Sequence, residues 1–295
     1  MRLLDHYVQT AHTACLTLDP HREPLRLTAP RMDVAHRDFA NHDQALTWFT
    51  TDHPVLLAAI DEASSAGLDV HTWQLAWTLT TFFDRRGYWH DAAETQRAAL
   101  KATRRLGNGR GQAHAHRCLA YAYTQLGDYE QAQRDYRYAL DLFTELGDRT
   151  GQAHTHLNLT RMFDRRRRHG EALCHAQRAL DLYREAGHRS GQIRALNAVG
   201  WCHALLGDHE LTLVFCQEAL DLHKEVHDPD GEAQTWDTLG YAHHHLGHHS
   251  QAVTCLQHSV YLWRDLGDRY YEAETLIHFG KANLAAGRPD EARAA

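Results

Sequence analysis

The sequence predicts an all-α fold, a right-handed superhelical solenoid built from helical hairpins that repeat every 40 residues. Three observations predict this fold. Glycines recur at intervals of 40 or 80 residues, the apolar residues between them follow the spacing of an α-helix, and no proline occurs from residue 55 to residue 228. The chain has 295 residues, 43% of them hydrophobic. This content is sufficient for a buried core and argues against intrinsic disorder.

Each repeat is expected to consist of a helix A, a tight turn, a helix B and a short glycine loop. The turn after helix A is marked by Gly87, Gly127, Gly207, Gly247 and Gly287, with Arg167 as the exception. Helix B is ended by Gly107, Gly147, Gly187 and Gly267, with His227 as the exception. A third series follows in the loop, at Gly111, Gly151, Gly191 and Gly231. The residues expected to cap the next helix A are Asn108, Asp148, Asp228 and Asp268, with His188 as the exception.

The 40-residue frame divides the chain into three parts. Residues 71–295 are the repeat array, with five full repeats from about residues 73, 113, 153, 193 and 233 and a truncated sixth from 273. Residues 41–70 are expected to form a degenerate leading hairpin, with a short helix around 42–50 and a helix B over 52–66 that has Pro54 in its first turn. Residues 1–40 are expected to be a linker or a remnant of a preceding module, beginning with a helix from Leu3 to Leu16.

Composition excludes several classes of function. The net charge of −7, from 31 basic and 38 acidic residues, leaves no overall basic footprint for nucleic acid or for an anionic membrane. The six cysteines show no paired spacing, which predicts reduced thiols, and no apolar run approaches the roughly 20 residues of a membrane span. We therefore expect a cytoplasmic protein.

Two stretches carry the pattern of small and aromatic residues that is typical of one repeat family. They read L-A-Y-A-Y-T-Q-L-G-D-Y-E-Q-A from Leu119 and L-G-Y-A-H-H-H-L-G-H-H-S-Q-A from Leu239. Both resemble the tetratricopeptide repeat (TPR), although the period is 40 residues instead of the usual 34 or so. The surplus residues are expected at the end of helix B and in the loop that follows.

Other segments resemble the AfsR-type branch of the Streptomyces antibiotic regulatory protein (SARP) family. They are R-L-L-D-H-Y-V-Q-T-A-H from Arg2, D-P-H-R-E-P from Asp19, A-L-T-W-F-T-T-D-H-P-V-L-L-A-A-I from Ala45 and F-F-D-R-R-G-Y-W from Phe82. The resemblance implies a sensor or effector domain from the C-terminal part of a large transcriptional regulator of antibiotic and secondary-metabolite genes. It also implies DNA-binding and ATPase modules outside this chain. No G-x-x-x-x-G-K-[ST] loop for nucleotide phosphates occurs in the sequence.

A binding surface is expected on the inner face, which we define as the face of the A helices that does not pack against other helices. The second, fifth, ninth, twelfth and thirteenth positions of each repeat lie there. Arginine, amide and aromatic side chains at these positions suit a peptide, a protein or another domain of the same regulator. The candidate residues are Trp77, His114, Arg117, Tyr121, Gln125, His154, Arg161, Asp164, Arg165, Arg194, Asn197, Trp201, Gln234, Asp237, Tyr241, His244, Glu274 and Lys281.

Alternative functions have weaker signals. The histidines from His243 to His249 suggest a metal-dependent enzyme, but the turn at Gly247 breaks the helical spacing that His244 and His248 would need as ligands. The run Arg165–Arg168 suggests a direct nucleic-acid contact, although a solvated face is the more common role of such a run. The frame places no nucleophile and base together, so we expect no catalysis, no cofactor and no bound metal. Self-association through an uncapped last repeat is a further possibility.

Overall fold

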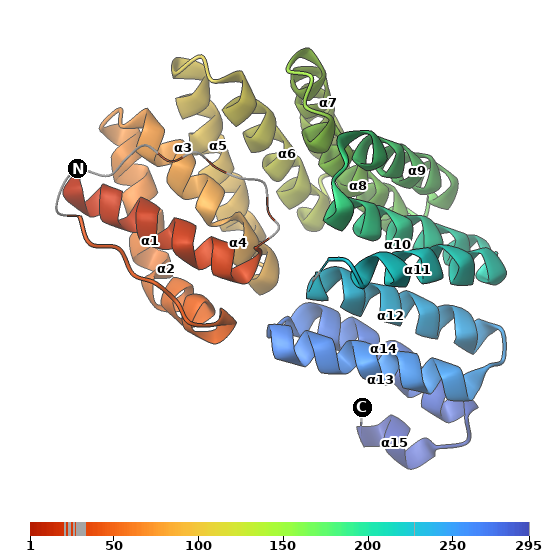
Figure 1. The fold of residues 1–295 in the computed structure, drawn as a ribbon. Coiled ribbons are helices and arrows are strands. Elements are labelled where there is room, and N and C mark those ends of the chain that lie inside the picture. The colour runs from red at the N-terminus through yellow and green to blue at the C-terminus, as the bar shows by residue number, and fades with distance from the viewer. Residues whose placement is uncertain (21, 23–24, 26, 28–33, 227, 295) are drawn as a thin grey trace. The chain divides into compact units, whose positions relative to one another are not determined.

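The computed structural model describes residues 1–20, 22, 25, 27, 34–226 and 228–294. This part of the chain is helical and contains no strand. It forms two compact units, unit 1 (Met1–Gly151) and unit 2 (Gln152–Ala295). Within each unit, consecutive helices pack against one another in chain order (Figure 1). The predicted all-α fold of helical hairpins is therefore confirmed.

The helices alternate between A and B positions of the repeat, except that α3 and α4 together occupy one A position. In unit 1 they are α1 (Arg2–Leu18), α2 (His42–Ser65), α3 (Asp69–Thr78), α4 (Thr80–Arg86), α5 (Trp89–Arg105), α6 (Gly109–Leu126) and α7 (Tyr129–Glu145). Helix α8 (Arg149–Arg165) starts at the end of unit 1 and continues into unit 2. Unit 2 also contains α9 (His169–Ala186), α10 (Arg189–Leu206), α11 (His209–His223), α12 (Pro229–His245), α13 (His249–Leu266), α14 (Arg269–Ala285) and α15 (Pro289–Ala294).

The 40-residue period is present in the helix starts. The A helices α6, α8, α10, α12 and α14 begin at residues 109, 149, 189, 229 and 269, and the B helices from α5 to α15 begin at residues 89, 129, 169, 209, 249 and 289. Each helix A begins four residues before the repeat start predicted from the sequence, because it begins directly after its capping residue. The loop between repeats is correspondingly shorter than expected, and the third glycine series lies inside the A helices.

The turn glycines adopt the backbone conformation for which the sequence selects them. Positive φ angles between 62° and 90° occur at Gly67, Gly87, Gly107, Gly127, Gly147, Gly187, Gly207, Gly247, Gly267 and Gly287. Arg167 is the one other residue with a positive φ among the described residues, at 55°. The turn between α8 and α9 therefore keeps the repeat geometry although it lacks the glycine. His227, which breaks the second series, lies outside the described residues.

We expect Arg167→Gly to raise the stability of the protein by about 1 kcal/mol, because glycine avoids the steric cost of a left-handed conformation. Urea unfolding followed by circular dichroism measures the effect. Arg166→Gly is the matched control, because residue 166 does not have a positive φ, and this substitution should give no gain. A lower unfolding midpoint for Arg167→Gly would contradict the prediction.

The predicted caps act on the A helices, and His188 is not an exception. Asn108, Asp148 and Asp228 each accept a hydrogen bond from the amide three residues later, at 2.9 to 3.1 Å. The ring nitrogen Nδ1 of His188 accepts from the amide of Gly191 at 2.9 Å in the same way. A neutral imidazole has a lone pair available for this bond, so histidine can replace the carboxylate or amide at this position.

The leading hairpin predicted over residues 41–70 is not present, because α2 is one continuous helix of 24 residues with Pro54 inside it. The partner of α2 is α1, which also contacts α3 and α4 (Figure 1). These contacts are those of a helix A, so α1 takes the place that residues 42–50 were expected to fill. The start of the chain is therefore part of the folded array, and its helix is slightly longer than predicted.

Candidate peptide-binding surface

In unit 2, side chains from four successive A helices meet on the inner face. Trp201 of α10 donates from Nε1 to Oδ2 of Asp164 of α8 at 3.2 Å. Its ring lies 5.1 Å from that of Tyr241 of α12 and 6.1 Å from that of His278 of α14. The Tyr241 ring is also 4.4 Å from that of His245. We call Asp164, Trp201, Tyr241, His245 and His278 the inner cluster.

The surroundings of the inner cluster shift the pKa values of its histidines in different directions. His278 Nδ1 is 3.0 Å from Oδ1 of Asp237. Burial works against the charged form of His278, but Asp237 outweighs it and raises the pKa above the ordinary value. Burial and the neighbouring imidazoles lower the pKa of His244 and of His245. At neutral pH His244 and His245 are therefore neutral imidazoles, which can both donate and accept hydrogen bonds, whereas Asp237 favours the charged form of His278.

A second group of contacts joins α8 to α14, three repeats later. Nη2 of Arg165 donates to the hydroxyl of Tyr270 at 3.2 Å, and this hydroxyl donates to Oε1 of Glu274 at 2.9 Å. Cζ of Arg161 lies 5.5 Å from the centre of the Tyr271 ring. Side chains of the first and last A helices of unit 2 therefore contact each other.

The remaining predicted residues of unit 2 fall into two groups. Arg194 pairs with the buried carboxylate of Asp228, at 2.9 Å from Nε and 3.2 Å from Nη2, and Asn197 is buried in the core. Arg194 and Asn197 contribute to the packing of the helices, so we do not include them in the peptide-binding surface. His154, Gln234 and Lys281 are partly or fully exposed on their A helices, and His154 Nδ1 is 2.5 Å from the Tyr183 hydroxyl.

In unit 1 the predicted residues are divided between core and surface. Trp77 and His114 are buried. Arg117, Tyr121 and Gln125 of α6 are half-buried, and the hydroxyl of Tyr121 donates to Oδ1 of Asp84 at 2.9 Å. The face of Trp77 is covered by Arg22, whose Cζ lies 3.6 Å from the ring centre.

Two residues that contact the predicted side chains were not selected from the sequence. They are His278, in the inner cluster, and Arg22, which covers Trp77. His278 occupies the sixth position of its repeat, where Thr78, Cys118, Asn158, Ala198 and Thr238 are smaller. A large titratable residue at a position of otherwise small residues was the available signal. Arg22 carries no comparable signal, because its contact with Trp77 joins residues 55 apart and arises only from the tertiary fold.

Two histidines of the A helices, His116 and His156, have partners inside the protein. His116 Nδ1 is 2.6 Å from Oδ1 of Asp135. His156 Nδ1 is 2.9 Å from Nδ1 of His175, and the two rings are stacked. Burial, then the neighbouring His175 and Arg178, lower the pKa of His156 to about 4, and burial lowers the pKa of His175. Both His156 and His175 are therefore neutral at pH 7.

This pair makes the stability sensitive to mild acid. A histidine in the unfolded chain has a pKa of about 6.5, so below that pH the unfolded state binds more protons than the folded state, and stability falls as pH falls from about 6.5 toward 4. For His156 alone the loss between pH 7 and pH 5 is about 2 kcal/mol. His156→Leu, which has the residue found at the equivalent position 196, should flatten the dependence measured by urea unfolding. The exposed control His90→Gln should leave it unchanged, and an equal slope in all three proteins would contradict the prediction.

The cysteines and the histidine run do not assemble a reactive centre in the part of the chain that the structure describes. Burial raises the pKa of Cys202 to about 12 and that of Cys255 to about 11, so these thiols stay protonated at neutral pH. Helix α12 ends at His245 and α13 begins at His249, so the two halves of the histidine run lie on different helices. No group of three or more His, Cys, Asp or Glu side chains among the described residues is placed to hold a metal ion.

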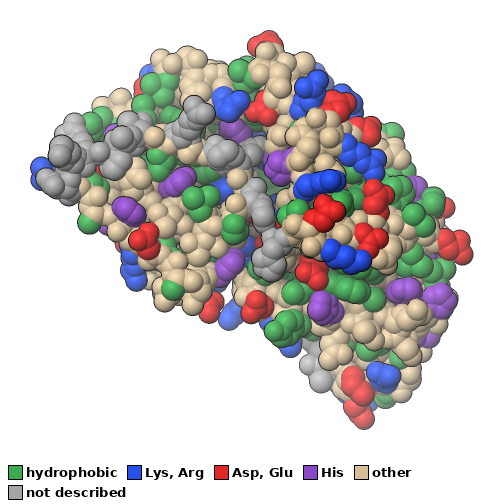
Figure 2. Space-filling view, viewed as in Figure 1, with side chains coloured by type: hydrophobic (Ala, Val, Ile, Leu, Met, Phe, Trp, Pro, Cys, Tyr) green, Lys and Arg blue, Asp and Glu red, His purple; other side chains and the backbone are tan. Residues whose placement is uncertain are grey.

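Two side chains of the arginine run, Arg165 and Arg168, contact other residues of unit 2. Besides the Arg165 bond to Tyr270, Arg168 forms an ion pair with Glu171 and lies over the Phe163 ring at 5.1 Å. On the face drawn in Figure 2, basic and acidic side chains are interleaved. A continuous row of basic side chains, which binding to a nucleic-acid backbone requires, is not visible among the described residues on that face.

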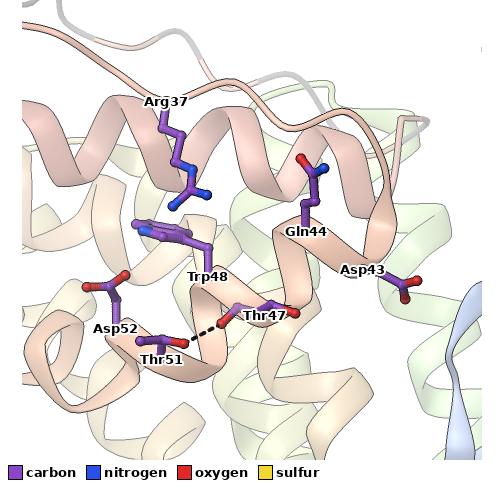
Figure 3. Close-up of a pocket in the computed structure, with 7 residues that line it drawn as sticks. All are labelled: Arg37, Asp43, Gln44, Thr47, Trp48, Thr51 and Asp52. Atoms are coloured by element: carbon purple, nitrogen blue, oxygen red, sulfur yellow. Dashed lines mark hydrogen bonds between the residues drawn. The ribbon is translucent and has the colours of Figure 1, made fainter.

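A shallow hollow lies beside α2, away from the predicted residues. It is lined by Arg37 and by six residues of α2, Asp43, Gln44, Thr47, Trp48, Thr51 and Asp52. Figure 3 shows the Arg37 side chain extended toward the Trp48 ring. The hollow is open to solvent, and Trp48 is the one aromatic residue in its lining.

Two exposed apolar side chains lie on the last A helix. Ile277 is 59% exposed and Leu284 is 62% exposed on α14. They lie seven residues apart, which places them on the same side of the helix. Self-association through this repeat stays a prediction, and sedimentation at increasing protein concentration would measure it.

Comparison with known proteins identifies the family. The family model described as tetratricopeptide repeat matches residues 111–185, 191–260 and 232–295. These ranges together cover more than half of the chain, which therefore belongs to the TPR family. No curated protein matches this chain in sequence. No helix in the described part of the chain is long and apolar enough to cross a membrane.

Solved structures of low sequence identity share the fold. BtubC from P. vanneervenii is 21% identical with a TM-score of 0.57, over 70% of this chain and 87% of BtubC. A Rap protein complexed with competence and sporulation factor is 13% identical with a TM-score of 0.61, over 80% and 77%. A signal transduction ATPase with numerous domains (STAND) from Pyrococcus horikoshii, which has a tetratricopeptide repeat sensor, is 16% identical with a TM-score of 0.59. That match covers 81% of this chain but 36% of the ATPase.

Proposed function

We propose that this chain is a non-catalytic binding domain that holds a peptide or protein segment on the inner face of unit 2. The observation that carries the proposal is the inner cluster, in which α8, α10, α12 and α14 each contribute a side chain to one surface. TPR proteins are in general scaffolds for protein interaction, and the family model that matches this chain is of that kind.

The chemistry of the surface fits a peptide better than a small metabolite. Trp201 and Tyr241 provide two adjacent aromatic anchors, the residue types that contribute most binding energy at interfaces. Arg161 and Arg165 can pair with carboxylates of a ligand through planar guanidinium groups. Neutral His244 and the Gln234 amide can hydrogen-bond to a peptide main chain.

We propose further that the domain is the sensor or effector part of a transcriptional regulator of antibiotic or secondary-metabolite genes. Two observations support this setting. The segments from Arg2, Ala45 and Phe82 resemble AfsR-type regulators, and the fold is shared with a STAND ATPase that has a tetratricopeptide repeat sensor and with a Rap protein complexed with competence and sporulation factor. The partner would then be a peptide, another protein or a module of the same regulator.

Selection from a random peptide library displayed on phage tests the binding function. Peptides selected on the intact protein should lose at least tenfold in affinity for Trp201→Ala or Tyr241→Ala, as expected when an aromatic anchor is removed. The matched control is Tyr261→Ala on the B helix α13, an aromatic residue that is 66% exposed, and this variant should bind normally. Selected peptides that bind both inner-cluster variants with full affinity would contradict the proposal.

A titration tests the regulatory setting separately. The ATPase module of an AfsR-type regulator should bind the intact protein saturably and bind Trp201→Ala more weakly. If the binding of selected peptides depends on Trp201 but no ATPase module binds, the peptide-binding function is supported. The proposal that the partner is a module of the same regulator is then contradicted.

A further inference from the structure

Two imidazole rings face each other across the turn between α12 and α13. Nδ1 of His243 lies 3.4 Å from Nδ1 of His248, and the ring centroids are 5.6 Å apart. This separation is longer than the roughly 3 Å of an ordinary hydrogen bond. His243 is half-buried and His248 is exposed, so solvent and dissolved ions can reach the pair.

The backbone of the turn fixes this arrangement. The amide of His248 donates to the carbonyl oxygen of His243 at 2.9 Å, and Gly247 between them has a φ of 78°. His243 belongs to the last turn of α12, and His248 directly precedes α13. The two rings are therefore brought together by the fold, and a ligand that binds both of them pays little additional ordering cost.

The same two positions of the repeat contact each other in earlier repeats, with different chemistry. They are the eleventh and sixteenth positions of the 40-residue frame. Nδ1 of His203 is 3.3 Å from Oδ2 of Asp208, and Arg168 lies over the Phe163 ring at 5.1 Å. The repeat that starts near residue 233 has histidine at both positions.

The spacing of the two nitrogen atoms suits a tetrahedral metal ion. Zinc binds an imidazole nitrogen at about 2.0–2.1 Å. An ion at that distance from two nitrogens 3.4 Å apart would have an angle of about 110° between these ligands, close to the tetrahedral value. Coordination uses the lone pair of each Nδ1, with the ring protons on Nε2, whereas a hydrogen bond between the rings uses one lone pair.

We propose that His243 and His248 chelate a zinc ion at the turn between α12 and α13. No third His, Cys, Asp or Glu side chain joins them among the described residues, so water or a side chain of a bound partner completes the coordination. The sequence predicted no bound metal because it considered the spacing of His244 and His248 on one helix. The turn instead pairs residues five positions apart, and the inference does not depend on peptide binding by the inner face.

Isothermal titration of the intact protein, produced without a histidine tag, with zinc chloride at neutral pH tests the site. The double variant His243→Phe/His248→Arg has the residues of the equivalent positions 163 and 168, which already contact each other in this protein. This variant is therefore expected to fold. Its zinc affinity should be at least tenfold lower, because loss of even an outer-shell partner of a metal ligand commonly has that effect.

The matched control uses the neighbouring histidine pair. The rings of His244 and His249 cross the same turn with centroids 5.7 Å apart, but the charge of Lys281 acts on His244 and opposes a cation there. The control variant His244→Ala/His249→Tyr has the residues of the equivalent positions 204 and 129. It should bind zinc with the affinity of the intact protein.

Single substitutions at the exposed ligand keep the test decisive if circular dichroism shows the Phe/Arg variant unfolded. His248→Ala should lose zinc affinity at least tenfold, in the same way as the double variant. His248→Cys should retain binding, because a cysteine thiolate is also a zinc ligand. A loss for alanine that cysteine restores indicates coordination at this position, since a change of packing alone would not be repaired in that way.

Thermal unfolding gives a second readout. An ion that binds the folded state stabilises it, so zinc should raise the unfolding midpoint of the intact protein and of the Ala/Tyr control, but not that of the Phe/Arg variant. Equal zinc affinity of the intact protein and the Phe/Arg variant would overturn the proposal, as would a loss confined to the Ala/Tyr control. Trp201→Ala should bind zinc normally, so this result can be distinguished from the test of peptide binding.

Discussion

Gly191→Ala is expected to destabilise the protein by about 3 kcal/mol, at the upper end of what overpacking of a core usually costs. A Cβ atom at residue 191 would lie 2.3 Å from Cδ1 and Cε1 of the Tyr183 ring. That ring is fully buried, and its hydroxyl is 2.5 Å from Nδ1 of His154. The ring therefore cannot move without losing packing and a hydrogen bond. Urea unfolding of unit 2, followed by circular dichroism, measures the effect.

The matched control for Gly191 is Gly170, in the first turn of α9. A Cβ at residue 170 would meet no atom within 4 Å, so Gly170→Ala should leave stability unchanged or raise it by up to about 1 kcal/mol. Tyr183→Leu should lessen the effect of Gly191→Ala, since it removes the ring that the new methyl group meets. A loss of stability below about 0.5 kcal/mol for Gly191→Ala would contradict the prediction. It would mean that α9 and α10 separate more easily than the structure indicates.

Asp228→Ala is expected to cost about 3 kcal/mol, the usual effect of removing one partner of a buried ion pair. The Asp228 carboxylate belongs to a residue 1% exposed and accepts from Ser190 Oγ at 2.6 Å, in addition to Arg194 and the Gly231 amide. Burial alone would raise the pKa of this carboxyl, but Arg194, Ser190 and Gly231 outweigh burial and lower it to about 2. Asp228 therefore caps α12 and at the same time binds Ser190 and Arg194 of α10.

The pH dependence gives this prediction a second readout. A carboxyl with a lowered pKa stabilises the folded state above the unfolded pKa of about 3.9, and this stabilisation is lost as pH falls toward 2. The difference between the intact protein and Asp228→Ala should therefore be the same at pH 7 and at pH 5. The control is Asp221→Asn, an exposed carboxylate 2.7 Å from Lys224, which should have little effect on stability because water screens an exposed ion pair. Similar losses for Asp221→Asn and Asp228→Ala would contradict the assignment.

The repeat frame illustrates which parts of the fold could be predicted from the sequence. Helix ends depend on local preferences of the backbone, so the turn positions could be predicted, including the turn at Arg167, where glycine is absent. The role of Gly191 could not be predicted. The space beside this residue is limited by the Tyr183 ring, and that space depends on how closely α9 and α10 approach each other. The sequence placed this glycine in a loop, whereas the structure has it in the first turns of α10.

The candidate site was predictable to a lesser extent. The frame selected Trp201, Tyr241 and Asp164, which the structure brings together on one surface of unit 2. It also selected Asn197, which is buried, because the fixed positions of the frame ignore small rotations of successive helices. The pairing of α1 with α2 was missed, since helices separated by residues 19–41 have no local pattern that links them.

The amino-acid sequence by itself determined the 40-residue period, the helix ends and the TPR family, since these follow from local backbone preferences and from the periodicity of apolar residues. Only the tertiary structure decided that α1 completes the first hairpin, that Arg22 covers Trp77 and that Asp228 pairs with Arg194. The physical reason is that these contacts join residues far apart in the chain, 55 positions for Arg22 and Trp77 and 34 for Asp228 and Arg194, and which of them form depends on the packing of whole helices.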